Sequence, residues 1–485
     1  MAYPEWVEKQ RRRGTNITCI RGKYYLYEAS SHWDKEKKRS VKKTGKYLGR
    51  ITEEGLIPPR KNQNKNQDAD SENAENKEKI TVKEYGASSV LCSLGSEIFA
   101  NLQKIFPEEA EEIFTLAALK VIEQCPFKRM EFLYEKSYLS DKFGKLPLSK
   151  ASISGFLRKL GEKREQIKMF MKEFIGETEY ILFDGTNIIT KSEKLDINRV
   201  GYNSHRQYDP QINLLYAFST DNNSPAYYRI VSGNVRDVSS FKLTVEDSGI
   251  KNMVVIADKG FGSKANFELL EQNNLKYIVP LRRNNNLFKK DILKSGDRNK
   301  FDGYFLFNKR VIWFYEYKID DQRLIVFLDS DLKNDEEKDY LQRLEAKYEN
   351  YSQQGFLEKQ YDFGTIVMQT NLDDDPQKIY ELYKSRGQIE QSFDFLKNFL
   401  DADKIYLQDK YAVEAWAFIN HISMMLTYII YSKLKSKKLL SKFSVPDFIS
   451  HLKYIHRLKC NHSFSVSEIS SKTSDLLNAL DIHIT

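Results

Sequence analysis

The sequence has 485 residues, of which 41% are hydrophobic and 30% are charged, with 29 Phe and 29 Tyr, and this composition excludes a chain that is disordered throughout. The length predicts two to four domains. The formal net charge is +8, but residues 1–61 hold 16 Lys and Arg against 7 Asp and Glu, so the remainder is nearly neutral. This local excess predicts a phosphate-rich partner for the N-terminal region, and the alternative is a basic tail that only aids solubility.

The cysteines and the N-terminus indicate a cytoplasmic protein. The four cysteines are scattered without a Cys-x-x-Cys pair, which favours a reducing compartment over a disulfide framework. His456, Cys460 and His462 have the spacing of half a zinc site, but no second ligand pair accompanies them, so surface or core roles are favoured. The first residues lack the apolar run of a signal peptide, and we therefore expect the protein in the cytoplasm.

The first 176 residues divide into three predicted regions. Residues 17–50 alternate aromatic and polar positions, which predicts short strands joined by a charged turn, within a basic β-rich DNA-binding region at 1–61. Residues 62–79 are polar and without aromatics, which predicts a disordered linker. Helical periodicity over 80–176 predicts a helical region for DNA binding or dimerisation.

A change of period near residue 179 predicts a mixed α/β sheet. The predicted strands, in chain order, are 180–184, 212–219, 226–233, 254–258 and 277–281, with a helix between the last two. The dense β pattern at 303–330 predicts a β insertion over 286–364, which ends in a charged helix at 335–351. A strand at 365–371 and a long helix at 377–400 follow.

The C-terminal part is predicted to be helical from residue 412 onward, with a basic helical region at 431–485. The segment between Glu414 and Lys433 has no charged residue, but it contains Asn420 and His421. It therefore predicts a buried core helix and not a membrane span, and we expect no membrane partner.

Two predicted strands end in a carboxylate, Asp184 and Asp258. In open α/β sheets, functional groups gather at strand ends, where side chains emerge from the packed core. A single aspartate at such a position also serves turns and helix caps, so these two residues alone do not establish a site.

One face of the predicted helix at 377–400 carries Tyr383, Arg386, Glu390 and Lys397, within a sector of about 60° at 100° per residue. A buried stripe beside this face predicts that the helix packs against the body and brings Glu390 near the sheet. The alternative is a solvated face with ordinary helix ion pairs.

Three carboxylates without a histidine or cysteine cluster form an oxygen-only ligand set, which suits magnesium, or manganese as the alternative, and not zinc. Two such ions activate a water or sugar hydroxyl and stabilise the leaving oxygen of a phosphodiester. Arg386 and Lys397 on the same face would hold phosphates beside the metals. The residues therefore predict a nuclease or strand-transfer site.

The string YKSRGQIEQSFDFLK, with Tyr383-x2-Arg386-x3-Glu390-x6-Lys397, resembles the signature of bacterial insertion-sequence transposases of the IS-four superfamily. FDGTN and ADKGF are similar to the two aspartate strands of these DDE enzymes. The resemblance covers about residues 179–430 and implies an RNase H-like mixed sheet at 177–285 and 365–430, an all-β insertion, and mainly helical flanking regions.

The resemblance also implies the roles of the site residues. Asp184, Asp258 and Glu390 would be catalytic and bind two magnesium ions, and Tyr383, Arg386 and Lys397 would contact the DNA backbone. The implied activity is cleavage at the terminal inverted repeats of the element and joining of the 3′-hydroxyl ends to target DNA, by a homodimer on double-stranded DNA.

An RNase H-like nuclease without strand transfer and a domesticated DNA-binding protein remain as alternatives. Trp313, Phe314 and Tyr315 would be candidates to stack on a flipped base, with core packing as the other interpretation.

Overall fold

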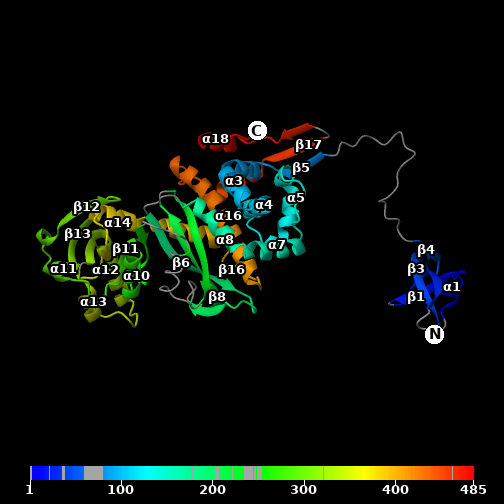
Figure 1. Ribbon diagram of the computed structural model, residues 1–485, viewed down its shortest axis with the longest axis horizontal. Helices are drawn as coiled ribbons and strands as arrows, with labels where there is room; N and C mark the ends of the chain where they lie inside the picture. The colour runs from blue at the N-terminus through cyan, green and yellow to red at the C-terminus, as the bar shows by residue number, and fades with distance from the viewer. Residues whose placement is uncertain are drawn as a thin grey trace. The chain divides into compact units, whose positions relative to one another are not determined.

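The computed structural model describes residues 3–20, 22–34, 39–58, 80–175, 180–202, 207–220, 222–233, 244, 247, 254–320, 322–460 and 463–484. The chain divides into two compact units, Met1–Lys77 and Glu78–Thr485 (Figure 1). The predicted linker at 62–79 lies outside the described residues.

The N-terminal unit is a four-stranded antiparallel sheet with one short helix, in the order β1-β2-β3-β4. Its elements are α1 (Glu5–Glu8), β1 (Thr15–Ile20), β2 (Lys23–Asp34), β3 (Arg39–Thr52) and β4 (Gly55–Ile57). Val7 of α1 packs with Ile17, Leu26 and Ile51 in a small core of its own. Aromatic and apolar residues at every second strand position supply this core, as the alternating pattern predicted.

The second unit begins with a strand and a group of helices. They are β5 (Ile80–Glu84), α2 (Gly86–Leu94), α3 (Ser96–Ile105), α4 (Ala110–Glu123), η1 (Phe127–Arg129), α5 (Met130–Lys136), α6 (Leu139–Lys142), α7 (Lys150–Glu162) and α8 (Arg164–Glu173). In Figure 1 these helices gather on one side of β6 and β8. Lys120 of α4 is buried and donates to the Leu400 carbonyl at 2.6 Å, which ties the helical group to the segment that carries the predicted site.

The central sheet has the strand order and directions of an RNase H-like fold. Its strands are β6 (Tyr180–Thr190), β8 (Tyr208–Ser219), β9 (Ser224–Ser232), β10 (Val254–Ile256) and β11 (Lys276–Leu281), with β7 (Arg199–Tyr202) beside β8 and α10 (Lys264–Gln272) before β11. The order is β9-β8-β6-β10-β11, antiparallel among the first three and parallel from β6 to β11. The α/β class predicted from the sequence is thus present in the structure.

The segment between β11 and α14 extends this same sheet. It contains α11 (Asp291–Ser295), η3 (Arg298–Lys300), β12 (Gly303–Phe307), β13 (Arg310–Ile319), β14 (Gln322–Asp329), α12 (Ser330–Glu345), α13 (Gln353–Lys359) and β15 (Thr365–Thr370). β15 pairs antiparallel with both β11 and β14, so the strands of the insertion and the central strands form one hydrogen-bonded sheet. The charged segment predicted to be helical forms α12, which is capped by the Asp329 carboxylate.

The C-terminal elements differ from the predicted helices at two places. They are α14 (Pro376–Lys384), α15 (Gly387–Asp394), η4 (Phe395–Phe399), β16 (Lys404–Ile405), α16 (Lys410–Ser436), α17 (Val445–Lys453), β17 (His456–Cys460), β18 (Ser463–Val466) and α18 (Ser471–Ala479). The predicted single helix at 377–400 is interrupted between α14 and α15 and ends in a π-helical turn. The predicted helical region at 431–485 contains the β17–β18 hairpin, because β17 pairs with the distant strand β5 and this pairing overrides local preference.

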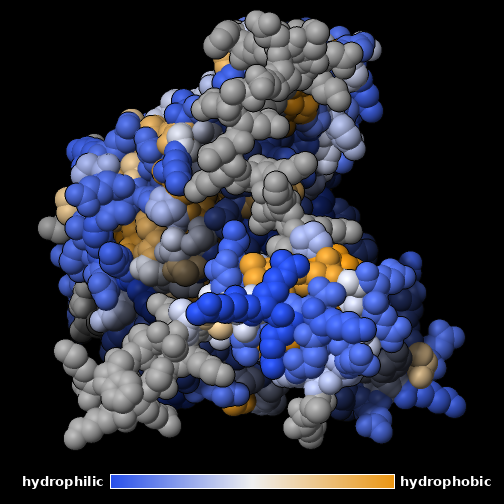
Figure 2. Space-filling model, turned by 90° about the vertical axis from the view of Figure 1, so that its right-hand side faces the viewer, coloured by the Kyte–Doolittle hydropathy of each residue, from blue (hydrophilic) through white to orange (hydrophobic). Residues whose placement is uncertain are grey.

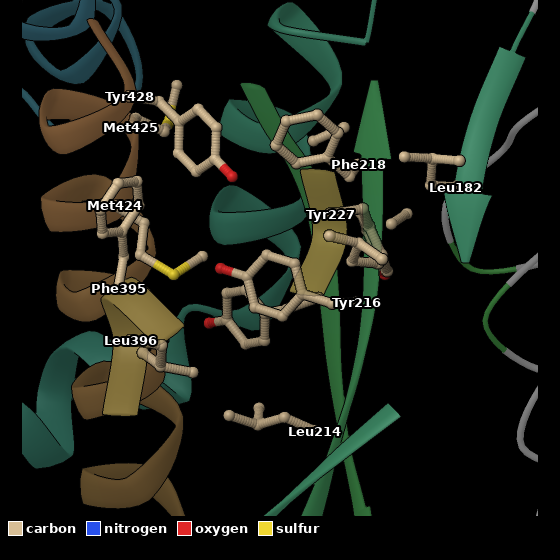
Figure 3. Close-up of a cluster of buried hydrophobic side chains, with 14 of the residues drawn as sticks. Leu182, Leu214, Tyr216, Phe218, Tyr227, Phe395, Leu396, Met424, Met425 and Tyr428 are labelled. Carbon is tan, nitrogen blue, oxygen red and sulfur yellow. The ribbon is translucent and has the colours of Figure 1, made fainter. Parts of the chain in front are cut away.

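The uncharged segment after Glu414 forms most of α16, a core helix. By length and composition α16 would suffice to cross a membrane, but 89% of its apolar window is buried inside the protein. Figure 3 shows Met424, Met425 and Tyr428 of α16 pointing toward Tyr216 and Phe218 of β8, with Phe395 and Leu396 between the helix and the sheet. On the face drawn in Figure 2, hydrophilic residues predominate and hydrophobic ones form small patches.

His421 of α16 makes this core sensitive to acid. Its Nδ1 lies 2.6 Å from the Tyr216 hydroxyl, and burial, assisted by the positive charge of Arg164, lowers the pKa of His421 to about 3. His421 is therefore neutral in the folded protein and takes up a proton on unfolding. Below the unfolded pKa of about 6.5, stability falls by about 1.4 kcal/mol per pH unit until the pH reaches about 3.

We expect the wild-type protein to lose about 2 kcal/mol more than His421→Gln between pH 6.5 and pH 5. The measurement is the free energy of unfolding by urea at each pH, and the difference between the two proteins removes the contribution of all other titrating groups. Equal pH slopes for both would show that His421 is not held neutral.

Candidate active site

Asp184 and Asp258 lie level with each other on neighbouring parallel strands. β6 and β10 pair with Leu182 opposite Ile256, and each aspartate stands two residues further along. Asp258 follows the end of β10, as predicted, and precedes the short helix η2 (Lys259–Phe261). Asp184 differs from the prediction because β6 does not end there: the β-branched residues that follow continue the strand to Thr190.

Glu390 and Arg386 are brought to these aspartates by α15 and the turn before it. Ile389 of α15 is fully buried and packs in the main core, so the helix is held close to β6. Arg386 lies in the turn between α14 and α15, and Glu390 follows one helical turn later. This arrangement turns both side chains toward the strands that carry Asp184 and Asp258.

The guanidinium of Arg386 contacts all three carboxylates. Its Nη1 donates to Asp258 Oδ1 at 2.9 Å, and its Nη2 donates to Asp184 Oδ2 at 3.3 Å and to Glu390 Oε1 at 3.2 Å. Nε is buried and has no hydrogen-bond partner among the described residues. The sequence predicted Arg386 beside the carboxylates as a phosphate ligand, whereas the structure places it between them.

The three carboxylates differ in their surroundings. The side chain of Asp184 is 17% exposed and that of Glu390 is 64% exposed. Burial raises the pKa of Asp184, while Arg386 and the Gly185 amide, which donates to Oδ1 at 2.8 Å, act in the opposite direction. Burial acts to lower the pKa of Arg386, but Asp184 and Asp258 outweigh it, so the pKa of Arg386 is raised. Arg386 is therefore a permanent cation in an acidic cluster.

The cluster has the chemistry of a divalent-cation site. Its donors are all carboxylate oxygens, and three carboxylates against one guanidinium leave an excess of negative charge. In the described part of the chain, no three His, Cys, Asp or Glu side chains stand close enough together to hold a metal ion as they are arranged. The carboxylates instead surround the guanidinium of Arg386.

The other two predicted DNA contacts lie beside this cluster. Tyr383 of α14 is half-buried, and its pKa is raised mainly by burial, against the charge of Arg386. Lys397 donates to Asn187 Oδ1 at 3.3 Å and not to any of the three carboxylates. Lys397 lies in η4, which follows directly on α15, and its contact with Asn187 places it beside β6, the strand that carries Asp184.

Sequence reasoning missed Asn187. This residue lies on β6, three positions beyond Asp184, and also donates to Gln211 Oε1 at 3.2 Å, which fixes the orientation of its amide. The only signal in the sequence is its place at the end of the FDGTN string, which we treated as a marker of the aspartate alone. Asn187 connects the strand of Asp184 to Lys397.

The aromatic residues considered for base stacking lie on β13, and two of the three residues considered for zinc lie on β17. Tyr315 is buried and donates to the Lys289 carbonyl at 2.6 Å, and the partly buried ring of Trp313 packs against Phe301 and Tyr304, so core packing accounts for this part of β13. His456 and Cys460 lie at the two ends of β17, and His462 is outside the described residues.

Comparisons with known proteins bear on the segment that carries the cluster. Residues 176–426, more than half of the chain, match the family described as "Transposase DDE domain". No curated protein matches the sequence.

Two solved structures are also similar. The piggyBac transposase synaptic complex with hairpin DNA is 12% identical, with a TM-score of 0.38 over 76% of this chain and 79% of that chain. The Mos1 transposase paired-end complex with the left transposon end is 14% identical, with a TM-score of 0.15 over 33% of this chain and 56% of that chain. Both TM-scores are below 0.5.

Proposed function

Because the chain belongs to the family of transposase DDE domains, we propose that it binds the terminal inverted repeats of an insertion sequence, cleaves the DNA there and joins the 3′-hydroxyl ends to target DNA. The observation that carries this proposal is the contact of Asp184, Asp258 and Glu390 with one guanidinium. We propose these three residues as the catalytic, metal-binding triad, in an element of the bacterial IS-four superfamily.

The acidic cluster fits divalent magnesium, with manganese as the alternative. Two bound ions would supply activation of a water or a 3′-hydroxyl and stabilisation of charge on the phosphate oxygens. Asp184 and Asp258, level on adjacent strands, would hold the ions on the rigid sheet, and Glu390 would close the site from α15. Its greater exposure leaves Glu390 open to the DNA side of the cluster.

Arg386, Tyr383 and Lys397 would act on the DNA backbone. Once released from the carboxylates, the guanidinium of Arg386 would be free to bind a phosphate bidentately next to the reacting bond. Tyr383 would donate a hydrogen bond from its hydroxyl to a phosphate oxygen, since its raised pKa keeps the hydroxyl protonated. Lys397, held by Asn187 on β6, would add a point charge further along the strand.

We propose the N-terminal unit as the part that holds the ends of the element, with a homodimer pairing two ends. Deletion of residues 1–61 removes 16 basic residues against 7 acidic ones. We expect it to weaken binding to end-containing DNA at least tenfold and to flatten the dependence of log affinity on log salt concentration. The measurement is fluorescence anisotropy over a salt series, and an unchanged affinity and slope would show that this region makes no DNA contact.

The decisive experiment incubates the protein with magnesium and DNA that carries both ends of the element, and then maps the cut and joined strands. Transposition predicts cuts at the element ends and covalent joining to target DNA. Cleavage without joined products would indicate a nuclease, and binding without either product would indicate a DNA-binding protein.

A further inference from the structure

The sheet of the N-terminal unit has two chemically different faces. Helix α1 covers one of them, where Tyr3 donates to the Ile17 carbonyl at 3.1 Å and Trp6 packs edge-on against Tyr24. Leu26 and Ile51 are the buried strand residues of this face. Because side chains alternate along a strand, the neighbours of Leu26 and Ile51 point to the opposite side.

That opposite side, which we call the tyrosine face, consists of Tyr25 and Tyr27 of β2 and Tyr47 and Arg50 of β3. The strands pair with Tyr25 opposite Arg50 and Tyr27 opposite Tyr47. The ring centroid of Tyr47 lies 5.3 Å from that of Tyr27 and 6.1 Å from that of Tyr25. The three phenols therefore form one continuous cluster with a guanidinium at its border. On the other border, β1 adds Thr18 opposite Tyr25.

The backbone around the tyrosine face narrows into a two-stranded ribbon. β1 pairs with β2 only over Lys23–Glu28, and β4 pairs with β3 only over its last residues. Beyond them, β2 and β3 continue to pair through six residue pairs, from Ala29 opposite Thr44 to Asp34 opposite Arg39, with no third strand beside them among the residues that the structure describes. At about 3.3 Å per residue this ribbon is about 20 Å long. A two-stranded ribbon fits the major groove of B-DNA, which is about 12 Å wide.

The charge of the region matches the same ligand. Residues 1–61 carry 16 basic and 7 acidic residues, whereas the rest of the chain has no basic excess. Phenol hydroxyls, Thr and Arg are donors to phosphate oxygens and to base edges. The three rings are tilted by 46° and 55° against one another and do not form parallel platforms for the successive bases of an unpaired strand, so a duplex suits the cluster better.

We propose that the tyrosine face and its ribbon bind in the major groove of duplex DNA. This inference rests on the proposed function only in taking DNA as the ligand. Tyr25, Tyr27 and Tyr47 donate to acceptors on base edges and nearby phosphates, and their rings contact thymine methyl groups. Arg50 neutralises a phosphate at the border of the groove.

The test uses the full-length protein with a fluorescein-labelled 30-base-pair duplex of random sequence, and the same labelled strand unpaired, in anisotropy titrations. We expect the double variant Tyr25→Ala/Tyr27→Ala to bind the duplex at least tenfold more weakly. Arg50→Gln keeps all three rings, and we expect it to reduce the slope of log affinity against log salt by about one. Tyr348→Ala, at a tyrosine that is 60% exposed in the other unit, is the matched control and should bind as the wild type does.

Two groove ligands define the position of the contact. Methyl green, which occupies the major groove, should compete with the wild-type protein, and distamycin, which occupies the minor groove, should not. Three results would each overturn the inference. Distamycin alone could compete with the protein, or the variants could lose affinity only for the unpaired strand. Both variants could also keep the duplex affinity and salt slope of the wild type.

The outcome for the inference can be separated from the outcome for the proposed function. If the tyrosine variants lose duplex affinity but the wild type neither cuts nor joins DNA, the tyrosine face is supported as the DNA contact and the proposed reaction is refuted. If the variants bind normally and the wild type cuts and joins element ends, the reaction stands and the tyrosine face is not the DNA contact.

Discussion

Replacement of Glu390 by Gln is expected to reduce cleavage of end-containing DNA about a thousandfold while leaving DNA affinity within about twofold. The substitution removes one charged oxygen ligand and preserves the shape of the side chain. Metal stabilisation of developing charge is worth several kcal/mol, and each 1.36 kcal/mol corresponds to about tenfold in rate. Glu390 is 64% exposed, so the fold should tolerate the change. The measurement is the single-turnover rate of strand cleavage with saturating magnesium.

The matched control is Glu381→Gln. Glu381 lies on α14, accepts a hydrogen bond from Gln377 at 2.9 Å and takes no part in the carboxylate cluster. The Glu381→Gln variant should cleave DNA at the wild-type rate. Cleavage by Glu390→Gln at more than about a tenth of the wild-type rate would contradict the assignment of Glu390 to the triad.

Replacement of Arg386 by Gln is expected to lower the free energy of unfolding by about 2 kcal/mol without metal and to increase the stabilisation that magnesium provides. Loss of one partner from a fully buried ion pair costs about 3–5 kcal/mol, and the partial exposure of Asp258 and Glu390 reduces this figure. In the wild type, magnesium must displace a guanidinium that contacts all three carboxylates. In the variant it has no such competitor, so its binding should stabilise the fold at lower concentration.

The measurement for Arg386→Gln is the unfolding midpoint in urea over a magnesium titration. Arg283→Gln is the control, because it removes an ion pair of 3.0 Å to Glu336 that takes no part in the carboxylate cluster. Its loss of stability should be the same at every magnesium concentration. An equal magnesium effect on wild type, Arg386→Gln and Arg283→Gln would show that the guanidinium does not occupy the place of the metal.

The central sheet and the acidic residues of the candidate site could be predicted from the sequence because both depend on short-range patterns. The apolar runs before Asp184 and Asp258 predicted the two strands, and the apolar stripe of Ile389, Phe393 and Leu396 predicted that Glu390 would approach the sheet. These features need only the period of a strand or helix and the exclusion of apolar side chains from water.

The features that the sequence did not predict depend on contacts between distant parts of the chain. Arg386 contacts Asp258 and Asp184, which lie 128 and 202 residues earlier in the chain, and no local pattern encodes these contacts. Likewise, β17 is a strand because it pairs with β5, which lies more than 370 residues earlier in the chain. Each error concerned a segment whose conformation is set by its partner.

The pairing of β15 with both β11 and β14 has a mechanical consequence. β11 lies directly beside β10, and Asp258 follows the end of β10. The inserted strands cannot swing as a hinged lid, since any rotation between them and Asp184 and Asp258 would have to break a continuous backbone ladder. DNA bound by the insertion would therefore stay at a constant distance from Asp258, because both belong to one rigid sheet. Adjustment to different DNA paths would have to come from the double helix bending, not from the protein opening.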